Sequence, residues 1–312
     1  MRIAIFGTGG AAGFFGARLA QAGEDVAFIA RGEHLKAIQQ DGLLVETSSG
    51  ELRIHPAQAS ADPADIGHVD VVLLGVKTWQ VTSSAEAMRP LIGPQTVVVP
   101  LQNGIEAADQ LVAVLGAEHG LSGLCRVTSL IVAPGRLRQQ GAASSITLAE
   151  IDNSPSEQTD RLRATLENAG IRAPVPADIT VALWSKFLHA ASLGGIGAVC
   201  RAPVGVIRRL PDTRGLLEAA MQEVWDVGVA HGVAMDKEEV PRAMAGIDSM
   251  GEGGTMSLQR DIIAGRPSEL EAWSGAVVRL GEAVGVSVPT HSFVYHTLLP
   301  QERRARSEEH FD

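Results

Sequence analysis

The sequence predicts an α/β protein in which a doubly wound parallel sheet is followed by an all-helical domain. Three observations support this prediction. A glycine-rich turn joins a strand to a helix at the start of the chain, apolar runs typical of buried parallel strands alternate with helical segments over residues 1–101, and β-type patterns fade beyond residue 175. The 312 residues suit two cores, so we expect one domain over residues 1–175 and another over 176–312.

The first expected elements are a strand over Arg2–Phe6, the turn GTGGAAGFFG and a helix. Gly7 permits the turn, Gly9 lets the backbone approach a pyrophosphate, and Ala12 takes the small third position of the dinucleotide fingerprint. A glycine-rich turn alone is a weak signal, but its place between strand and helix favours a Rossmann-like nucleotide site. The expected cofactor-binding residues of this turn are Gly7, Thr8, Gly9, Gly10, Ala11 and Ala12.

A second strand, Asp25–Ala30, ends at Arg31. Enzymes that prefer NAD commonly place an acidic residue near this point, whereas an arginine suits the 2′-phosphate of NADP. The sequence therefore predicts NADP(H) as the cofactor. The alternative is that Arg31 is an ordinary surface arginine.

The following segments continue the alternation of strand and helix. A helix over 32–42 and a hairpin made by LLVET and ELRIHP precede two apolar strands, Val69–Val76 and Thr96–Leu101, with a helix over Thr78–Met88 between them. Ligands of doubly wound sheets collect at the carboxyl ends of the strands. The polar groups expected there are Lys77 and the run Gln102-Asn103-Gly104.

The remaining segments complete the predicted layout. β-rich pieces over 121–149, on either side of a turn at PGRLRQQG, are expected to finish the sheet, and a helix over 155–169 precedes the proline-containing boundary. The helices expected in the second domain are Ile179–Ala191, Thr213–Ala230, Glu238–Ile247, Pro267–Val284 and His291–Arg303.

Composition excludes several classes of function. A net charge of −10 argues against nucleic acid as a partner, since a phosphate backbone requires a basic face. Cys125 and Cys200 match no metal or redox spacing, so we expect no metal site and two buried free thiols. We see neither a signal peptide nor an apolar run long enough to cross a bilayer, and expect a soluble, cytoplasmic protein with no membrane partner.

Lys186 is the most informative residue of the second domain. It lies within or beside the apolar stripe formed by Ile179, Leu183, Phe187 and Ala190. Desolvation there would lower its pKa towards a range in which it can donate a proton to a carbonyl oxygen. The alternative, which spacing alone favours, is a lysine at the edge of the stripe whose ammonium reaches water.

The chain resembles the ketopantoate reductase family, which reduces 2-dehydropantoate to D-pantoate with NADPH in pantothenate biosynthesis. The residues that carry the resemblance run nearly end to end: the glycine-rich opening, ARGEHLKAIQQDGL, GVKTWQV, LQNG, LWSKF and SLQRDIIAGRPSELE. The family has a Rossmann-like N-terminal domain and a helical C-terminal domain, with the active site in the cleft between them. The resemblance therefore implies the same layout, a 2-oxo acid substrate and NADPH.

The resemblance also implies roles for individual residues. Lys186 would donate a proton to the substrate carbonyl, and Glu269 would hold the lysine or a substrate hydroxyl. Asn103 would position the substrate and would itself lie beside the nicotinamide, as a cofactor-binding residue. Ser257 would bind the carboxylate side of the substrate, while Lys77 and Gln80 would lie on the cofactor side.

Each of these residues also has a purely structural alternative. Asn103 is compatible with a turn, Glu269 with the first turn of a helix, Ser257 with a helix N-cap and Lys77 with a solvated helix entry. Arg260, three residues beyond Ser257, reads as a solvated helix charge.

Two positions depart from the family pattern. Members commonly carry substrate-contacting asparagines one and two turns after the lysine, where this chain has Ala190 and Gly194. We expect these two residues to line the substrate site, to enlarge it and to relax or redirect specificity. His189 or Ser192 could compensate.

Two functional alternatives follow. One is a reductase of a bulkier or less polar 2-oxo acid, and the other is a non-catalytic NADP(H)-binding protein. The small residues of the second domain are also compatible with a homodimer.

Overall fold

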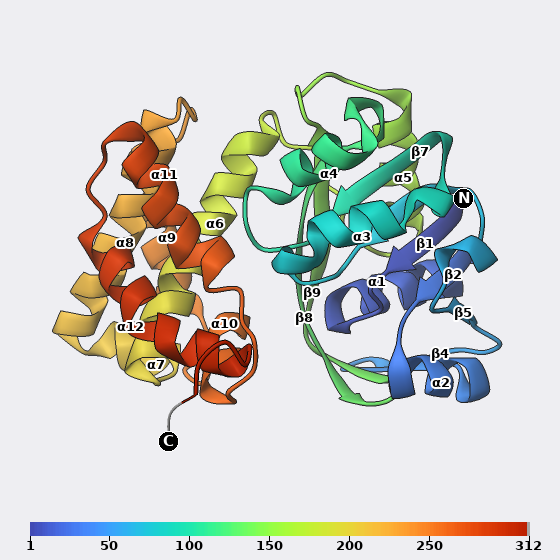
Figure 1. The fold of residues 1–312 in the computed structure, drawn as a ribbon, viewed down its shortest axis with the longest axis horizontal. Helices are drawn as coiled ribbons and strands as arrows, with labels where there is room; N and C mark the ends of the chain where they lie inside the picture. Colours follow the sequence, from blue (N-terminus) through green and yellow to red (C-terminus); the bar gives the residue numbers. More distant parts are fainter. Residues whose placement is uncertain (311–312) are drawn as a thin grey trace. The chain divides into compact units, whose positions relative to one another are not determined.

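The computed structural model describes residues 1–310, apart from the side chains at 142–143. The chain divides into two compact units. The first comprises Met1–Gln102 and Glu106–Ile179, and the second comprises Asn103–Ile105 and Thr180–Asp312. Strands are found in the first unit and helices make up the second (Figure 1). The division after Ile179 falls close to the expected boundary at 175, but Asn103–Ile105 were expected in the first domain and belong to the second unit.

A five-stranded parallel sheet forms the centre of the first unit. Its order is β5-β2-β1-β6-β7, so the chain starts in the middle strand and reverses direction beside it, as in doubly wound sheets. The strands are β1 Arg2–Phe6, β2 Asp25–Ile29, β5 Gln58–Ser60, β6 Val69–Leu74 and β7 Ile92–Pro100. The apolar runs predicted from the sequence therefore form adjacent parallel strands, and the predicted fold class is confirmed.

Alternate residues of these strands supply two separate cores. Ile3 and Ile5 of β1 pack with helix α1, whereas Ala4 and Phe6 of the same strand pack with α3 and α4. Both faces are covered, which explains why the strands read as continuous apolar runs rather than as alternating ones. The helices of this unit are α1 Gly10–Gln21, α2 Gly32–Asp41, α3 Val81–Ala87, α4 Ala107–Leu115 and α5 Glu157–Asn168.

A second sheet of order β4-β3-β9-β8 packs against α1. The expectation that residues 121–149 finish the first sheet is wrong, because β8 and β9 pair with each other and β9 pairs in parallel with β3. The expected eight-residue turn is also too long, since strand pairing resumes at Arg136. The strands are β3 Leu43–Thr47, β4 Gly50–Ile54, β8 Leu121–Ala133 and β9 Arg136–Glu150, and β3 and β4 form the predicted hairpin.

The second unit is helical, and α6 forms part of its core. This helix continues nine residues beyond the predicted end at Ala191. Gly194, Gly195 and Gly197 lie within it and do not interrupt it. A short helix, α7 Val204–Arg209, was not expected. The helices are α6 Ile179–Cys200, α7 Val204–Arg209, α8 Pro211–Ala230, α9 Glu239–Ser249, α10 Ser257–Ile263, the π-helical segment η5 Glu271–Gly275, α11 Ala276–Val284 and α12 Pro289–Ala305.

Two expectations about composition need correction. By length and apolar composition α6 could cross a membrane, contrary to the expectation of no such run, although 61% of its most apolar stretch is buried inside the protein, as in a core helix. Both cysteines are free, and Cys125 is buried as expected, but Cys200 is only partly buried. Burial raises the pKa of the Cys200 thiol, which makes this group less reactive.

Candidate active site

The glycine-rich turn is held by hydrogen bonds to the end of β2. The amides of Gly7 and Thr8 donate to the carbonyl of Ile29 at 3.2 and 3.0 Å, and the Thr8 hydroxyl donates to the same oxygen at 3.0 Å. Gly7 has a φ of +84°, and a Cβ there would lie 2.7 Å from Cγ1 of Val76, so glycine is required for two reasons. The Thr8 side chain, predicted on the cofactor side, is buried and fixes the turn.

The next glycines are required for different reasons. A Cβ on Gly10 would lie 2.0 Å from the carbonyl oxygen of Ser129, so β8 covers this position. A Cβ on Gly75 would lie 2.2 Å from that of Ala12, which explains the small third position of the fingerprint as a close helix–strand contact. At Gly9 a Cβ would meet no protein atom closer than 3.8 Å. Packing therefore does not require glycine at position 9, whereas a pyrophosphate lying against the turn would.

Helix α1 starts at this turn with its amides unsatisfied by side chains. Its N-cap, Gly9, provides no side-chain hydrogen bond, its first turn contains no acidic residue, and Ala11 in that turn is small. The positive end of the helix dipole is therefore available to an anion. The residues of the turn fit the phosphates of a dinucleotide.

Arg31 lies just past the end of β2, where the sequence placed it. It is exposed and forms the N-cap position of α2. Lys77 occupies the equivalent place after β6, where its amide donates to Oε1 of Gln80 at 3.4 Å. Both cations thus follow carboxyl ends of strands in the parallel sheet.

Trp79 is a residue of this region that the sequence reasoning did not select. Its side chain is 42% exposed, and Nζ of Lys77 lies 5.9 Å from the centroid of its ring. An exposed tryptophan is conspicuous in a chain with 4% aromatic residues, and its place in GVKTWQV was the available signal.

Gln102 fixes the chain before Asn103. Its side-chain amide donates to the carbonyls of Leu74 and Val76, both at 3.0 Å, and so ties the end of β7 to the end of β6. Its Oε1 is buried without a hydrogen-bond partner among the described residues. The polar run after β7 therefore contains a structural glutamine followed by the predicted functional asparagine.

Four predicted residues belong to the second unit: Lys186, Asn103, Ser257 and Glu269. Lys186 is partly buried on α6, and Glu269, two residues before η5, is 6% exposed. Ser257 is the first residue of α10, whose N-cap is Met256, so its alternative interpretation as an N-cap is wrong. The indole Nε1 of Trp273 donates to the backbone carbonyl of Asn103 at 3.0 Å.

Arg260 differs from the solvated charge that we expected. It lies one turn after Ser257, is half-buried, and donates from Nη1 to the carbonyl and hydroxyl of Thr255 at 2.7 and 3.1 Å. Burial lowers the pKa of this guanidinium, an effect that Asp261 opposes. A partly desolvated cation beside Ser257 is a group that a carboxylate substrate would favour.

A buried carboxylate fixes the backbone that precedes Glu269. Both oxygens of Glu302 lie 3.0 Å from the amide nitrogen of Ser268, and the Ser268 hydroxyl donates to Oε2 at 2.5 Å. Arg306 donates from Nε to Glu302 at 2.6 Å and from Nη2 to the Ser268 carbonyl at 2.9 Å. We call Ser268, Glu302 and Arg306 the α12 clamp. Sequence patterns offered no sign of it.

The two positions that depart from the family pattern are both buried. Ala190 is 2% exposed, and a Cβ on Gly194 would lie 2.5 Å from Cζ3 of Trp273. The expectation that Gly194 enlarges the substrate site is therefore wrong, because the indole fills the space that its missing side chain leaves. Ser192, considered as a compensating residue, is 1% exposed.

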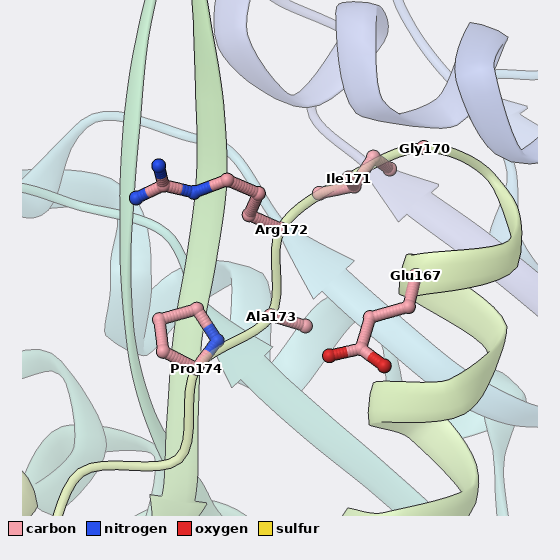
Figure 2. A pocket seen from close by; sticks show the side chains of 6 residues that line it. All are labelled: Glu167, Gly170, Ile171, Arg172, Ala173 and Pro174. Carbon is pink, nitrogen blue, oxygen red and sulfur yellow. The ribbon is translucent and has the colours of Figure 1, made fainter.

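A surface pocket in the first unit is lined by none of the predicted residues. Figure 2 shows its lining, in which the Arg172 side chain points away from Glu167. Arg18, in the last turn of α1, donates to the carbonyls of Ala169 and Gly170 beside it. Since α1 starts at the carboxyl end of β1, its last turn marks the opposite edge of the sheet. The pocket is lined by Glu167, Gly170, Ile171, Arg172, Ala173 and Pro174.

Comparisons with known proteins agree with this arrangement. The family model "Ketopantoate reductase PanE/ApbA" matches residues 3–153, and its C-terminal counterpart matches residues 178–302. A 2-dehydropantoate 2-reductase of Mesorhizobium japonicum is 32% identical over 93% of this chain and 94% of its own. A relative of the same name from a Nostoc species is 29% identical over 98% and 97%.

Solved structures give the same result. The 2-dehydropantoate 2-reductase of Geobacter metallireducens superposes with a TM-score of 0.90 at 30% identity, covering 96% of this chain and 99% of its own. A D-mandelate dehydrogenase, solved with NADH and anilino(oxo)acetate, reaches a TM-score of 0.90 over 98% and 99% at 22% identity and shares the fold. Family models, curated relatives and solved structures agree, and the chain belongs to the ketopantoate reductase family, whose members are oxidoreductases that act on a CH–OH group.

Proposed function

We propose that the protein is an NADPH-dependent 2-oxo acid reductase that converts 2-dehydropantoate to D-pantoate. The observation that carries this proposal is the location of Lys186, Asn103, Ser257 and Glu269 in one unit, in a chain that belongs to the ketopantoate reductase family. A protein that only binds a dinucleotide would need none of these four side chains.

The reaction assigns one task to each residue. The chemistry that NADPH supplies when bound is a hydride for the keto carbon. Lys186 donates a proton from Nζ to the oxygen of that carbonyl as negative charge develops on it. Glu269 orients the lysine or a substrate hydroxyl, Ser257 binds the carboxylate end of the substrate, and Asn103 orients the substrate.

The residues of the first unit support NADPH as the cofactor. The turn at Gly7–Ala12 and the open dipole of α1 fit a pyrophosphate, and exposed Arg31 follows β2 where a 2′-phosphate is read. Lys77 adds a second cation on the cofactor side.

The residues at positions 190 and 194 support a second candidate, a less polar 2-oxo acid. Ala190 offers no donor, and the Trp273 indole fills the space beside Gly194, so neither position supplies the polar contact that the family's asparagines make. A site that lacks such donors discriminates poorly in favour of a hydroxylated substrate. The filled space argues for a less polar substrate rather than a bulkier one.

A panel of 2-oxo acids tests the proposal. Steady-state rates would be compared for 2-dehydropantoate, 2-oxoisovalerate, 2-oxobutyrate and phenylglyoxylate, each with NADPH and with NADH. We expect the highest kcat/KM for 2-dehydropantoate with NADPH. An equal or higher value for an apolar acid would transfer the proposal to the second candidate.

Lys186→Ala separates a reductase from a non-catalytic binder. We expect its turnover to fall by about 10²- to 10⁴-fold, the range of a general acid, while NADPH affinity stays at the wild-type value. Unchanged turnover would refute the role of Lys186. Lys36→Ala provides the control, since Lys36 is an exposed lysine on α2 that pairs with Glu33.

A further inference from the structure

One buried side chain of the second unit meets several of the predicted site positions. Trp273 is fully buried and is the bulkiest of the side chains with less than 2% exposure among the described residues. Its ring lies against Gly194 and its indole N–H reaches Asn103. None of the roles carried over from the family resemblance involves it.

The indole N–H holds the segment that follows Gln102. It donates to the backbone carbonyl of Asn103 at 3.0 Å, and Ile105 packs against the core of the helical unit. These contacts agree with the assignment of Asn103–Ile105 to the second unit although the chain on either side belongs to the first. The Asn103 backbone is therefore positioned by the helical unit.

Glycine at position 194 is what allows the indole to lie there. A Cβ at this position would lie 2.5 Å from Cζ3 and 2.9 Å from Cε3 of Trp273, closer than real Cβ contacts, and 3.5 Å from Cβ of Leu258. The ring thus lies directly against α6 at Gly194. Gly194 and Trp273 act as a complementary pair.

The backbone of Trp273 is also tied to Glu269. Its amide donates to the carbonyl of Glu269 at 3.0 Å and to that of Leu270 at 3.3 Å, and the amide of Gly275 reaches Leu270 at 3.0 Å. The last bond spans five residues and gives η5 its π-helical form. Such segments recur at functional sites, where they redirect side chains.

We propose that Trp273 is a positioning residue that fixes Asn103 relative to Glu269 and that depends on Gly194 for its place. The inference rests on the proposed function for its catalytic consequence. The side chain acts through the backbone carbonyl of Asn103, to which its indole N–H donates at 3.0 Å.

Trp273→Phe tests the inference, because it removes the indole N–H and keeps an aromatic ring. We expect kcat for the preferred 2-oxo acid to fall about 3- to 10-fold, the value of one hydrogen bond. The KM for NADPH should change less than kcat, since Gly7–Ala12, Arg31 and Lys77 lie in the first unit and only Asn103 of the predicted cofactor residues lies in the second. Trp225→Phe is the matched control: it removes an indole bond of 2.9 Å to the carbonyl of Asp236 in the same unit, and should leave kcat unchanged.

Hydrogen exchange gives a readout that needs no activity. Peptides that cover residues 101–106 should exchange faster in Trp273→Phe than in the wild type, and at the wild-type rate in Trp225→Phe. If the wild type reduces no 2-oxo acid, the proposed function fails, while this measurement still tests the tie between Trp273 and Asn103. Unchanged exchange in Trp273→Phe would overturn the inference.

A double-mutant cycle tests the pairing with Gly194. Gly194→Ala should displace the indole and lower kcat in the wild-type background, and should have a smaller effect in the Trp273→Phe background, where the ring is shorter. Additive losses would overturn the pairing. Gly194→Ala also serves as the test variant if Trp273→Phe does not fold.

Discussion

Glu302→Gln should destabilise the helical unit by breaking the α12 clamp. The carboxylate is 4% exposed and accepts hydrogen bonds from the Ser268 amide, the Ser268 hydroxyl and Arg306. Glutamine keeps the shape and one acceptor oxygen, but its amide nitrogen faces groups that are themselves donors. At least one buried donor then loses its partner.

The size of the effect follows from the burial of the partners. Hydrogen bonds to charged groups contribute about 1.5–3 kcal/mol each, and breaking a fully buried ion pair costs about 3–5 kcal/mol. The Arg306 side chain is 23% exposed, so water partly replaces its partner. We therefore expect the free energy of unfolding to fall by about 2–3 kcal/mol.

Urea unfolding followed by tryptophan fluorescence would measure this change. Three of the four tryptophans, Trp184, Trp225 and Trp273, lie in the second unit, and Trp79→Phe in both backgrounds makes the signal report that unit alone. Glu309→Gln is the control, because Glu309 lies 3.9 Å from Arg303 with both side chains more than half exposed, and such pairs contribute about 0–1 kcal/mol. Equal changes in the two variants would refute the assignment of the clamp as a stabilising contact.

Three further predictions concern the cofactor, pH and specificity. Arg31→Ala should weaken NADPH binding far more than NADH binding in fluorescence titrations, and an equal loss would contradict a 2′-phosphate role. Burial lowers the pKa of His291 to about 4, below the ordinary 6.5, so the unfolded chain binds more protons between these values and stability should fall by about 3 kcal/mol as the pH drops from 6.5 to 4. The melting temperature of His291→Gln should depend less on pH than that of the wild type. An unchanged dependence would show that His291 does not cause the loss of stability at low pH. Gly194→Asn should lower kcat/KM for 2-dehydropantoate, because the new side chain collides with Trp273; a gain in kcat/KM would show that the indole moves aside.

Local patterns were sufficient to place the predicted nucleotide-binding residues of the first unit. The turn at Gly7, the strand ending before Arg31 and the position of Lys77 all depend on residues close in sequence, because strand, turn and helix signals act within one strand–turn–helix unit. The buried parallel strands could also be predicted from the sequence, because a strand that is buried on both faces needs a continuous apolar run.

Contacts between segments that are distant in the sequence could not be predicted from local patterns. The β-rich segment 121–149 has the same local character whether it extends the first sheet or forms another, and its pairing with β3 depends on residues about ninety positions away. The assignment of Asn103 to the helical unit likewise depends on Trp273, 170 residues further along the chain.

The sequence alone determined the fold class, the family resemblance and the residue types available for chemistry. Only the tertiary structure decided how those residues are supported: Trp273 fills the space at Gly194 and holds Asn103, while Glu302 fixes the backbone before Glu269. The physical reason is that propensity and periodicity act over a few residues, whereas the filling of a gap or the satisfaction of a buried donor depends on whatever side chain the fold brings there.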